Sequence, residues 1–181
     1  MRMGRVVLDM AVSLDGYASG PDGGDAGLHD WYFDPAPADV AVIDELLGEI
    51  GAMVLGRGML GAEPAGFDTP YRVPHFVMTR TARPTIDRGG VPFAFVTGGV
   101  EAVVGAARRA AGDRVVCVAG GPTTARAAMA AGLVDVLDLH VVSRVLGGGL
   151  RLYDGWPAVA LERERVVESA GVTHLRYRVV R

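Results

Sequence analysis

The chain has 181 residues, of which half are hydrophobic and 22% are charged, with 26 glycines and 10 prolines. This length and composition fit one globular domain with its own core, so long disordered regions are not expected. The formal net charge is −3 and arginine carries the positive charge, without the clustered basic face that nucleic-acid binding requires.

The N-terminal region does not resemble a secretory signal, because Asp9 and Asp15 interrupt its apolar stretch. No window reaches the ~18 apolar residues that a membrane helix needs. The lone Cys117 lies in an apolar run, where a buried and unreactive thiol is expected. We therefore expect a cytoplasmic protein with a small-molecule partner and neither a membrane nor a nucleic acid as partner.

An apolar run at residues 5–13 has the length of a strand and stops at a Leu-Asp-Gly turn signal. The segment 17–37 that follows is rich in Gly, Asp and Pro and contains three adjacent aromatic residues, Trp31 to Phe33. Such a loop is either a lid over a binding site or a connection that its aromatic residues pin to the core. Both interpretations stay open, and the first makes Trp31 a candidate substrate-binding residue.

The rest of the chain alternates helix and strand patterns. Apolar residues recur at helical spacing over residues 40–50, 100–111 and 123–131. Shorter apolar runs predict strands at 52–55, 74–79, 93–97, 115–119, 135–143, 160–167 and 173–180. With the first run this makes about eight strands, and the order predicts parallel crossovers with helices on both faces and a C-terminal antiparallel edge hairpin.

Three glycine clusters follow expected strands. Gly120 and Gly121 lead from a strand into a helix that begins near Pro122, and bare backbone there lets a phosphate reach the free N–H groups of the helix. A tight turn without a ligand would use the same residues. The glycines at 147–149 similarly fit either the close passage of a ligand or a flexible turn.

Residues 56–61 match the G-x-G-x-x-G pattern of dinucleotide sites, but Pro64 and Pro70 argue against a long helix after them. The next strand ends in Thr79-Arg80, without the acidic residue that would hold an NAD ribose, and an arginine there suits a 2′-phosphate. Glycine clusters at the ends of several parallel strands favour a nucleotide site over plain turns.

Five motifs in this order carry a family resemblance: Ser13-Leu14-Asp15-Gly16, Leu55-Gly56-Arg57, Gly120-Gly121, Gly132-Leu133-Val134-Asp135 and Leu146-Gly147-Gly148-Gly149. Over residues 5–180 the chain resembles the bacterial dihydrofolate-reductase-like proteins, which are related to the reductase domain of the bifunctional riboflavin-biosynthesis enzyme. The resemblance implies a single α/β domain over residues 1–181. It implies a dihydrofolate reductase-like three-layer fold, with a mixed eight-stranded sheet flanked by helices and a C-terminal antiparallel hairpin.

The resemblance also implies an NADPH site along the carboxyl ends of the central strands. It places Arg57 and Arg80 near the 2′-phosphate or pyrophosphate, with Gly56 and Thr79 beside them. It places Gly120, Gly121 and Thr123 near the pyrophosphate. Ala11 and Ser13 would lie near the nicotinamide.

An acidic residue near the start of the first helix binds the substrate and assists its protonation in the dihydrofolate reductases. The resemblance makes Asp39 the candidate for this catalytic role, and Asp15 is the second candidate. Helix capping by Asp39 and an ordinary turn at Asp15 are the structural alternatives. The acidic loop before this helix would repel the ribose phosphate carried by the substrate of a 5-amino-6-(5-phosphoribosylamino)uracil reductase.

The four histidines show no metal-ligand spacing and no obvious pairing with an acid, so we expect structural or solvent-facing roles for them and no metal site. The sequence thus predicts an NADPH-dependent oxidoreductase with a small heterocyclic substrate, of the riboflavin-pathway or the dihydrofolate type. A non-catalytic NADP(H)-binding protein is the alternative. The apolar terminal strands are compatible with a homodimer.

Overall fold

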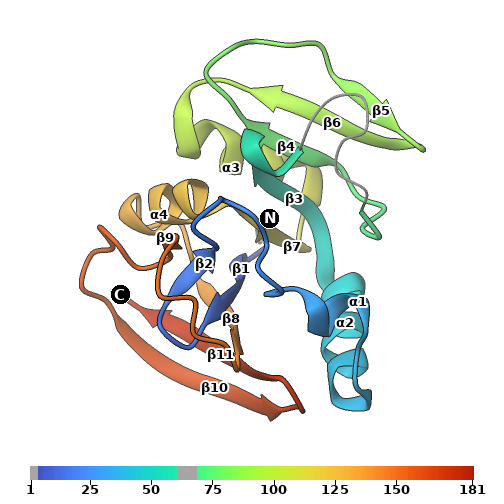
Figure 1. Ribbon diagram of the computed structural model, residues 1–181. Coiled ribbons are helices and arrows are strands. Elements are labelled where there is room, and N and C mark those ends of the chain that lie inside the picture. Colours follow the sequence, from blue (N-terminus) through green and yellow to red (C-terminus); the bar gives the residue numbers. More distant parts are fainter. Residues whose placement is uncertain (1–3, 61–68) are drawn as a thin grey trace.

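The computed structural model describes residues 4–60 and 69–181 and shows one large sheet with helices on both faces (Figure 1). The nine strands of this sheet have the order β10-β11-β8-β1-β7-β3-β4-β6-β5, and β2 and β9 form a separate pair. The strands are β1 (Val6–Ser13), β2 (Tyr17–Ser19), β3 (Ile50–Gly56), β4 (His75–Met78), β5 (Ile86–Arg88), β6 (Val91–Val96), β7 (Val115–Val118), β8 (Val136–Val142), β9 (Leu150–Arg151), β10 (Ala160–Glu168) and β11 (Val172–Val180). The helices are α1 (Asp30–Phe33), α2 (Pro37–Glu49), the 3-10 helix η1 (Arg57–Leu60), α3 (Gly99–Ala111) and α4 (Pro122–Ala130).

The α/β class and the mixed, helix-flanked sheet are confirmed. Strands β8, β1, β7, β3, β4 and β6 are parallel to one another, while β11 pairs antiparallel with β8 and with β10 to give the expected edge hairpin. The main sheet has one strand more than expected. The additional strand, β5, has only three residues and no apolar run, so nothing in its sequence marks it as a strand.

The core has two halves, one on each face of the sheet. Along β3, Ala52 and Val54 pack on the side of α3 and α4, whereas Met53 and Leu55 pack on the side of α2. This alternation follows from the two-residue period of a strand. All four side chains are buried, as expected for a parallel strand that is covered on both faces.

The order of the parallel strands reverses between β3 and β7. After β3 the chain adds β4 and then β6 on one side, and it then returns to place β7 between β3 and β1, and β8 beyond β1. Open α/β sheets bind their ligands at such a reversal, beyond the carboxyl ends of the strands. The topology therefore points to the ends of β3 and β7 as the place for a site.

The segment between β1 and α2 is pinned to the core. Trp31 of α1 is only 8% exposed and packs in a buried cluster with Ala11, Leu28 and Val142, whereas Phe33 is 82% exposed. Trp31 therefore fits the interpretation in which aromatic residues attach the loop to the core. In the described part of the chain, no helix has the length and apolarity to cross a membrane.

The burial of Phe93 predicts a large loss of stability on truncation. Phe93 of β6 is fully buried and stacks on His75 of β4, with ring centroids 4.5 Å apart. We expect Phe93→Ala to lower the free energy of unfolding by about 3–5 kcal/mol, because the cavity cannot close fully. The matched control, Phe33→Ala at an exposed position, should change it by less than about 0.5 kcal/mol. Urea unfolding of both variants measures this, and equal losses would contradict the described core.

Candidate functional site

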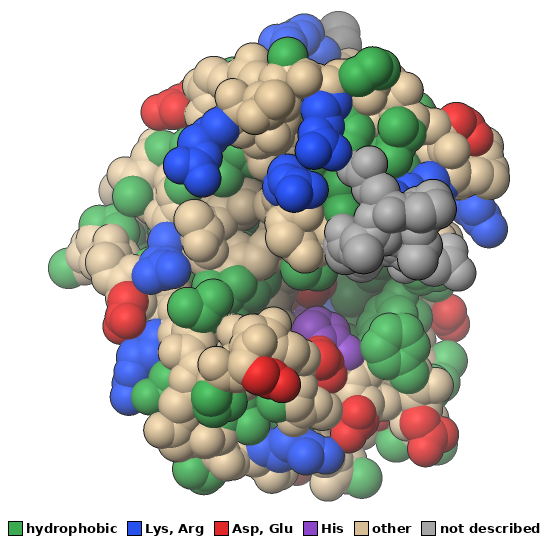
Figure 2. Space-filling view, turned by 45° about the horizontal axis from the view of Figure 1, so that its top comes forward, with side chains coloured by type: hydrophobic (Ala, Val, Ile, Leu, Met, Phe, Trp, Pro, Cys, Tyr) green, Lys and Arg blue, Asp and Glu red, His purple; other side chains and the backbone are tan. Residues whose placement is uncertain are grey.

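A cleft of about 1460 Å³ runs across the carboxyl ends of the central strands. Its walls come from Met10 and Ala11 on β1, from residues 119–121 after β7, from residues 56–59 after β3 and from residues 78–80 at the end of β4. Figure 2 shows the hollow, with blue arginine side chains on the upper side and red Asp and Glu side chains on the lower side. A pocket for one drug-sized ligand measures ~300–1,000 Å³, so this cleft has room for two ligands side by side.

Glycine allows the two central walls of the cleft to meet. The Gly56 N–H donates a hydrogen bond to the Gly120 carbonyl at 2.7 Å, and a Cβ on Gly56 would lie 2.6 Å from Oγ1 of the buried Thr124. Gly120 has a φ of +135°, and a Cβ there would lie 3.2 Å from Sδ of Met59. The following Gly121 is the N-cap of α4, so the first turn of α4 opens on the cleft.

Arginines gather at one end of the cleft. Arg57, Arg80 and Arg83 line it together with Thr79 and Thr123. Neither Arg57 nor Arg80 forms an ion pair with any residue that the structure describes, and both are exposed. Their guanidinium groups and the N-terminus of α4 together make this end favourable for phosphate groups.

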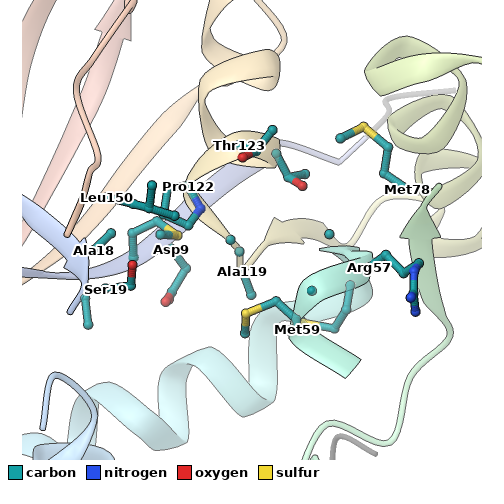
Figure 3. Close-up of a pocket in the computed structure, with 18 of the residues that line it drawn as sticks. Asp9, Ala18, Ser19, Arg57, Met59, Met78, Ala119, Pro122, Thr123 and Leu150 are labelled. Carbon is teal, nitrogen blue, oxygen red and sulfur yellow. The ribbon is translucent and has the colours of Figure 1, made fainter. Parts of the chain in front are cut away.

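The other end of the cleft is acidic and aromatic. Figure 3 shows Asp9 and Ser19 on one side of Ala119, with Arg57 and Met78 on the other side. The Asp9 side chain is 18% exposed, and its Oδ1 atom lies 3.4 Å from Nε2 of His140, which also lines the cleft. The Oδ2 atom of Asp9 is buried and has no hydrogen-bond partner in the described structure.

Behind this end, two histidines connect the cleft to Asp39. Nδ1 of His140 lies 2.7 Å from Nδ1 of His174, and Nε2 of His174 lies 2.9 Å from Oδ1 of Asp39. The sheet register places Ala11, His140 and His174 side by side on β1, β8 and β11. The expectation that no histidine pairs with an acid was therefore wrong for these two, and it was also wrong for His29, which pairs with Asp25.

The surroundings lower the pKa values of two of these groups, Asp39 and His174. Burial opposes ionisation of Asp39, but the hydrogen bonds that it accepts from His174 and from the Ala36 amide outweigh burial and hold its pKa below the ordinary value. Burial lowers the pKa of His174 despite the opposing effect of Asp39. The indole of Trp31 covers both histidines, with ring centroids 4.5 Å from His140 and 4.8 Å from His174. His174 is thus favoured in its neutral form next to an ionised Asp39.

A second buried ionic group lies on the same face of the sheet. Arg176 donates to both carboxylate oxygens of Asp138 at 2.8 Å and to Glu45 of α2 at 2.6 Å. Burial raises the pKa of Asp138, whereas the bonds from Arg176 act in the opposite direction. Because Arg176 belongs to β11, Asp138 to β8 and Glu45 to α2, the group fixes how these elements pack.

The structure brings most of the predicted site residues to the cleft, where their roles stay predictions. The residues that line it are Ala11, Trp31, Gly56, Arg57, Thr79, Arg80, Gly120, Gly121 and Thr123. Among the described lining residues Ser13 is absent, because its buried hydroxyl donates to Asp15 and accepts from the Tyr17 amide. Its place beside the nicotinamide stays a prediction that the described cleft does not support.

The two predicted catalytic acids do not line the cleft. Asp39 is 2% exposed and lies behind His174, because its second oxygen accepts from the Ala36 amide at the start of α2. Asp15 accepts hydrogen bonds from the amides of Leu146 and Gly147 as well as from Ser13, and these bonds lower its pKa to about 2. Both carboxylates are engaged in hydrogen bonds within the fold, and the catalytic role expected for either of them stays a prediction.

Two residues of the cleft were missed from the sequence, Asp9 and His140. Both interrupt strands whose neighbouring residues are almost all apolar and buried. Charged and titratable side chains are seldom fully buried without a partner, so their position inside such strands was a usable signal.

The glycine patterns at residues 56–61 and 147–149 have different structural roles. Gly56 and Gly58 line the cleft, but the only described helix after Gly56 is the short η1, which contains Gly58. Gly61 and Pro64 lie outside the described residues. The glycines at 147–149 do not line the described cleft. A Cβ on Gly149 would lie 1.9 Å from the carbonyl oxygen of Ser19, so this cluster allows β9 to approach β2.

Comparisons with known proteins agree with this geometry. The family model of the RibD C-terminal domain matches residues 5–175. A candidate riboflavin biosynthesis protein from Shewanella sp. PV-4 is 24% identical with a TM-score of 0.76, covering 99% of this chain and 100% of its own. No protein with a curated functional description matched the sequence.

Two further solved structures are similar. The diaminohydroxyphosphoribosylaminopyrimidine deaminase/5-amino-6-(5-phosphoribosylamino)uracil reductase of Thermotoga maritima is 16% identical, with a TM-score of 0.69, and the match covers 98% of this chain and 57% of that longer one. Dihydrofolate reductase from Enterococcus faecalis, complexed with NADP(H), is 17% identical, with a TM-score of 0.66 and 98% coverage of both chains. These likenesses confirm the dihydrofolate reductase-like fold.

The close approach at Gly56 can be tested directly. Gly56→Ala places a methyl group against Thr124 Oγ1, and we expect this overpacking to lower the free energy of unfolding by about 1–3 kcal/mol. Gly58→Ala, in the same segment, meets no atom within 4 Å and should leave stability nearly unchanged. Urea unfolding compares the two, and a neutral Gly56→Ala would show that the cleft walls do not touch as described.

The lowered pKa values of His174 and Asp39 predict a loss of stability in acid. A group whose pKa is lower in the folded state contributes stability that is complete above its unfolded pKa and is lost as the pH falls. With ordinary values of 6.5 for His174 and 3.8 for Asp39, the loss begins as the pH falls through 6.5 and continues below 3.8.

We expect the urea midpoint to be lower at about pH 5 than at about pH 7.5, and His174→Gln to show a smaller decrease. Burial also lowers the pKa of His75, so His75 accounts for part of the decrease that remains in His174→Gln. An unchanged midpoint over this range would show that His174 is not held in its neutral form.

Proposed function

The chain belongs to the RibD C-terminal domain family, and we propose that it is an NADPH-dependent reductase that acts on a small, flat heterocyclic substrate. The family and the fold support a reductase of the riboflavin-pathway or dihydrofolate-reductase type. The observation that carries the finer proposal is the division of one cleft into an arginine-rich end and an end with the half-buried Asp9 carboxylate, separated by glycine backbone.

The arginine-rich end fits the phosphate groups of NADPH. In this proposal Arg57 and Arg80 hold the 2′-phosphate, and the backbone at Gly120, Gly121 and Thr123 holds the pyrophosphate. A Cβ added to Gly121 meets no atom within 4 Å, so it would extend into open space in the wall of the cleft, where a bound group needs room. The nicotinamide then lies near Ala11 on β1, and the cofactor supplies a hydride there.

The Asp9 end fits the substrate. Trp31 and Tyr32 line this end together with Asp9 and His140, which gives apolar and aromatic walls beside a carboxylate. Such walls suit a flat ring, and the carboxylate suits an N–H group of that ring. The arginines among the described lining residues lie at the opposite end, so a ribose phosphate would find no partner here, and we propose a substrate without a phosphate group.

The protein's own residues would contribute position and a water-poor environment. Trp31 packs over His140 at the Asp9 end, and the volume of the cleft leaves room for two molecules that would be held next to each other. Trp31→Ala should therefore raise KM, whereas an unchanged KM would remove this residue from the site.

Cofactor choice tests the arginine-rich end. We expect the purified protein to bind NADPH more tightly than NADH, as measured by fluorescence titration. Arg80→Ala should weaken NADPH binding by about tenfold while leaving NADH binding unchanged, because it removes one charged partner of the 2′-phosphate. Arg109→Ala, on the exposed side of α3, is the control of equal charge and should bind both cofactors as the original chain does.

Turnover separates the reductase from a non-catalytic nucleotide-binding protein, which stays the alternative. NADPH oxidation is followed with dihydrofolate, with the phosphoribosylated pyrimidine of the riboflavin pathway and with unphosphorylated heterocycles. Oxidation with an unphosphorylated compound supports the proposal, whereas tight binding of NADPH without oxidation by any of them supports the alternative. A homodimer through the exposed edge strand β10 stays a prediction that sedimentation can test.

A further inference from the structure

The four side chains Asp9, His140, His174 and Asp39 form one continuous chain from the cleft into the core. The distances between their facing atoms are 3.4, 2.7 and 2.9 Å in that order. From this geometry we propose that Asp9 and His140 hold a transferable proton at the substrate end of the cleft, and that His174 and Asp39 fix the tautomer that makes this possible.

The number of protons in the chain follows from its hydrogen bonds. Asp39 is an acceptor, so Nε2 of His174 donates to it, and in a neutral imidazole Nδ1 of His174 must then accept. The facing Nδ1 of His140 therefore donates, which leaves Nε2 of a neutral His140 without a proton. Two neutral histidines thus supply two protons for three links, and the third link, between His140 and Asp9, needs a proton of its own.

This third link has the features of a site that gains and loses a proton. It is the longest of the three, at 3.4 Å, and it is the one formed by two residues that line the cleft. Nε2 of His140 and Oδ2 of Asp9 are both buried without a hydrogen-bond partner in the described structure. A proton on either atom of the link completes the chain, and its loss leaves two lone pairs facing each other.

Other titratable groups that face Asp9 are poorer donors. Burial raises the pKa of Tyr32 on α1, of Tyr71 and of Cys117 on β7, so these groups keep their protons at neutral pH. The carboxylate of Asp138 on β8 is engaged by two of the three nitrogen donors of Arg176. The exposed pair of Asp25 and His29 also lines the cleft and is the rival donor that the experiment must distinguish.

The chemical step rests on the proposed function. Hydride addition to the carbon of a C=N or C=O bond leaves the electron pair of that bond on the nitrogen or oxygen, which then needs a proton. The proton shared by Asp9 and His140 moves to this atom, so the substrate gains one hydride and one proton, and the cofactor is oxidised by two electrons. The link is left as a carboxylate facing a neutral His140 and is refilled from water. Asp9 is thus the proposed catalytic acid, and His174 and Asp39 are positioning residues.

The first test needs neither substrate nor cofactor. Nitrogen NMR of the labelled full chain reads which ring nitrogen of each histidine carries a proton as the pH is varied. We expect the Nε2–H tautomer for His174 and the Nδ1–H tautomer for His140, with one further proton taken up at His140 Nε2 at lower pH. In Asp9→Asn the side-chain amide donates to His140 Nε2, so this uptake should be lost, and Asp30→Asn, at an exposed pair outside the cleft, should retain it. The same tautomer in both histidines, or uptake that Asp9→Asn leaves unchanged, would overturn the chain.

The second test uses the rate of NADPH oxidation with any compound that the preceding panel shows to be reduced. Asp9→Asn should lower this rate by about 100-fold or more, with the Kd for NADPH changed less than about twofold, and should remove its decrease with rising pH. His174→Gln should lower the rate less and keep the pH dependence. Retained rate in Asp9→Asn together with loss in Asp25→Asn would assign the donor to the rival pair.

The two proposals can fail separately. If no compound is reduced but the tautomers and the Asp9-dependent proton uptake are as expected, the proposed function is wrong and the chain is correct. If a compound is reduced and Asp9→Asn, shown to be folded by its NADPH binding, retains both rate and pH dependence, the proton chain is wrong and the reductase is correct.

Discussion

The contact between the end of β3 and the start of α4 is the constraint on which the site depends. Gly56 donates to the Gly120 carbonyl at 2.7 Å, and there is no room for a Cβ beside Thr124. Because neither glycine has a side chain, the backbone of the two segments can meet here, with Oγ1 of Thr124 packed against Gly56 and the Met59 side chain against Gly120. A larger residue would separate β3 from α4 and change the width of the cleft along its whole length.

The position of this contact in the topology gives the cleft two chemically different ends. β3 and β4 lead outward to Arg57 and Arg80, whereas β1 and β8 lie on the other side of β7 and carry Asp9 and His140. A ligand with phosphate groups and a ligand that offers an N–H group would therefore be oriented in opposite directions and meet over the glycines. The two different ends of the cleft would thus orient both ligands before any reaction takes place.

The face of the sheet under α1 and α2 is polar where most sheet faces are apolar. His174 and Arg176 of β11 lie under α2 and are held by Asp39 and Glu45. Buried groups of this kind are tolerated because each is bonded on several sides, and removing one partner would leave the other uncompensated. The last strand, β11, thus supplies the side chains that connect the core to the Asp9 end of the cleft.

The sequence by itself determined the α/β class, the three long helices α2, α3 and α4, the central strands and the glycine turns that follow them, because periodicity and turn chemistry are local properties. It did not mark the short helix α1, which lies in a segment that reads as a loop. It could not show β5, which has three residues and no apolar run, nor the direction in which Asp39 points. Asp39 and His174 are 135 residues apart, and His140 and His174 are 34 apart. Only the pairing of β8 with β1 and β11, a long-range property set by packing, decided that Asp9 and not Asp39 or Asp15 reaches the cleft.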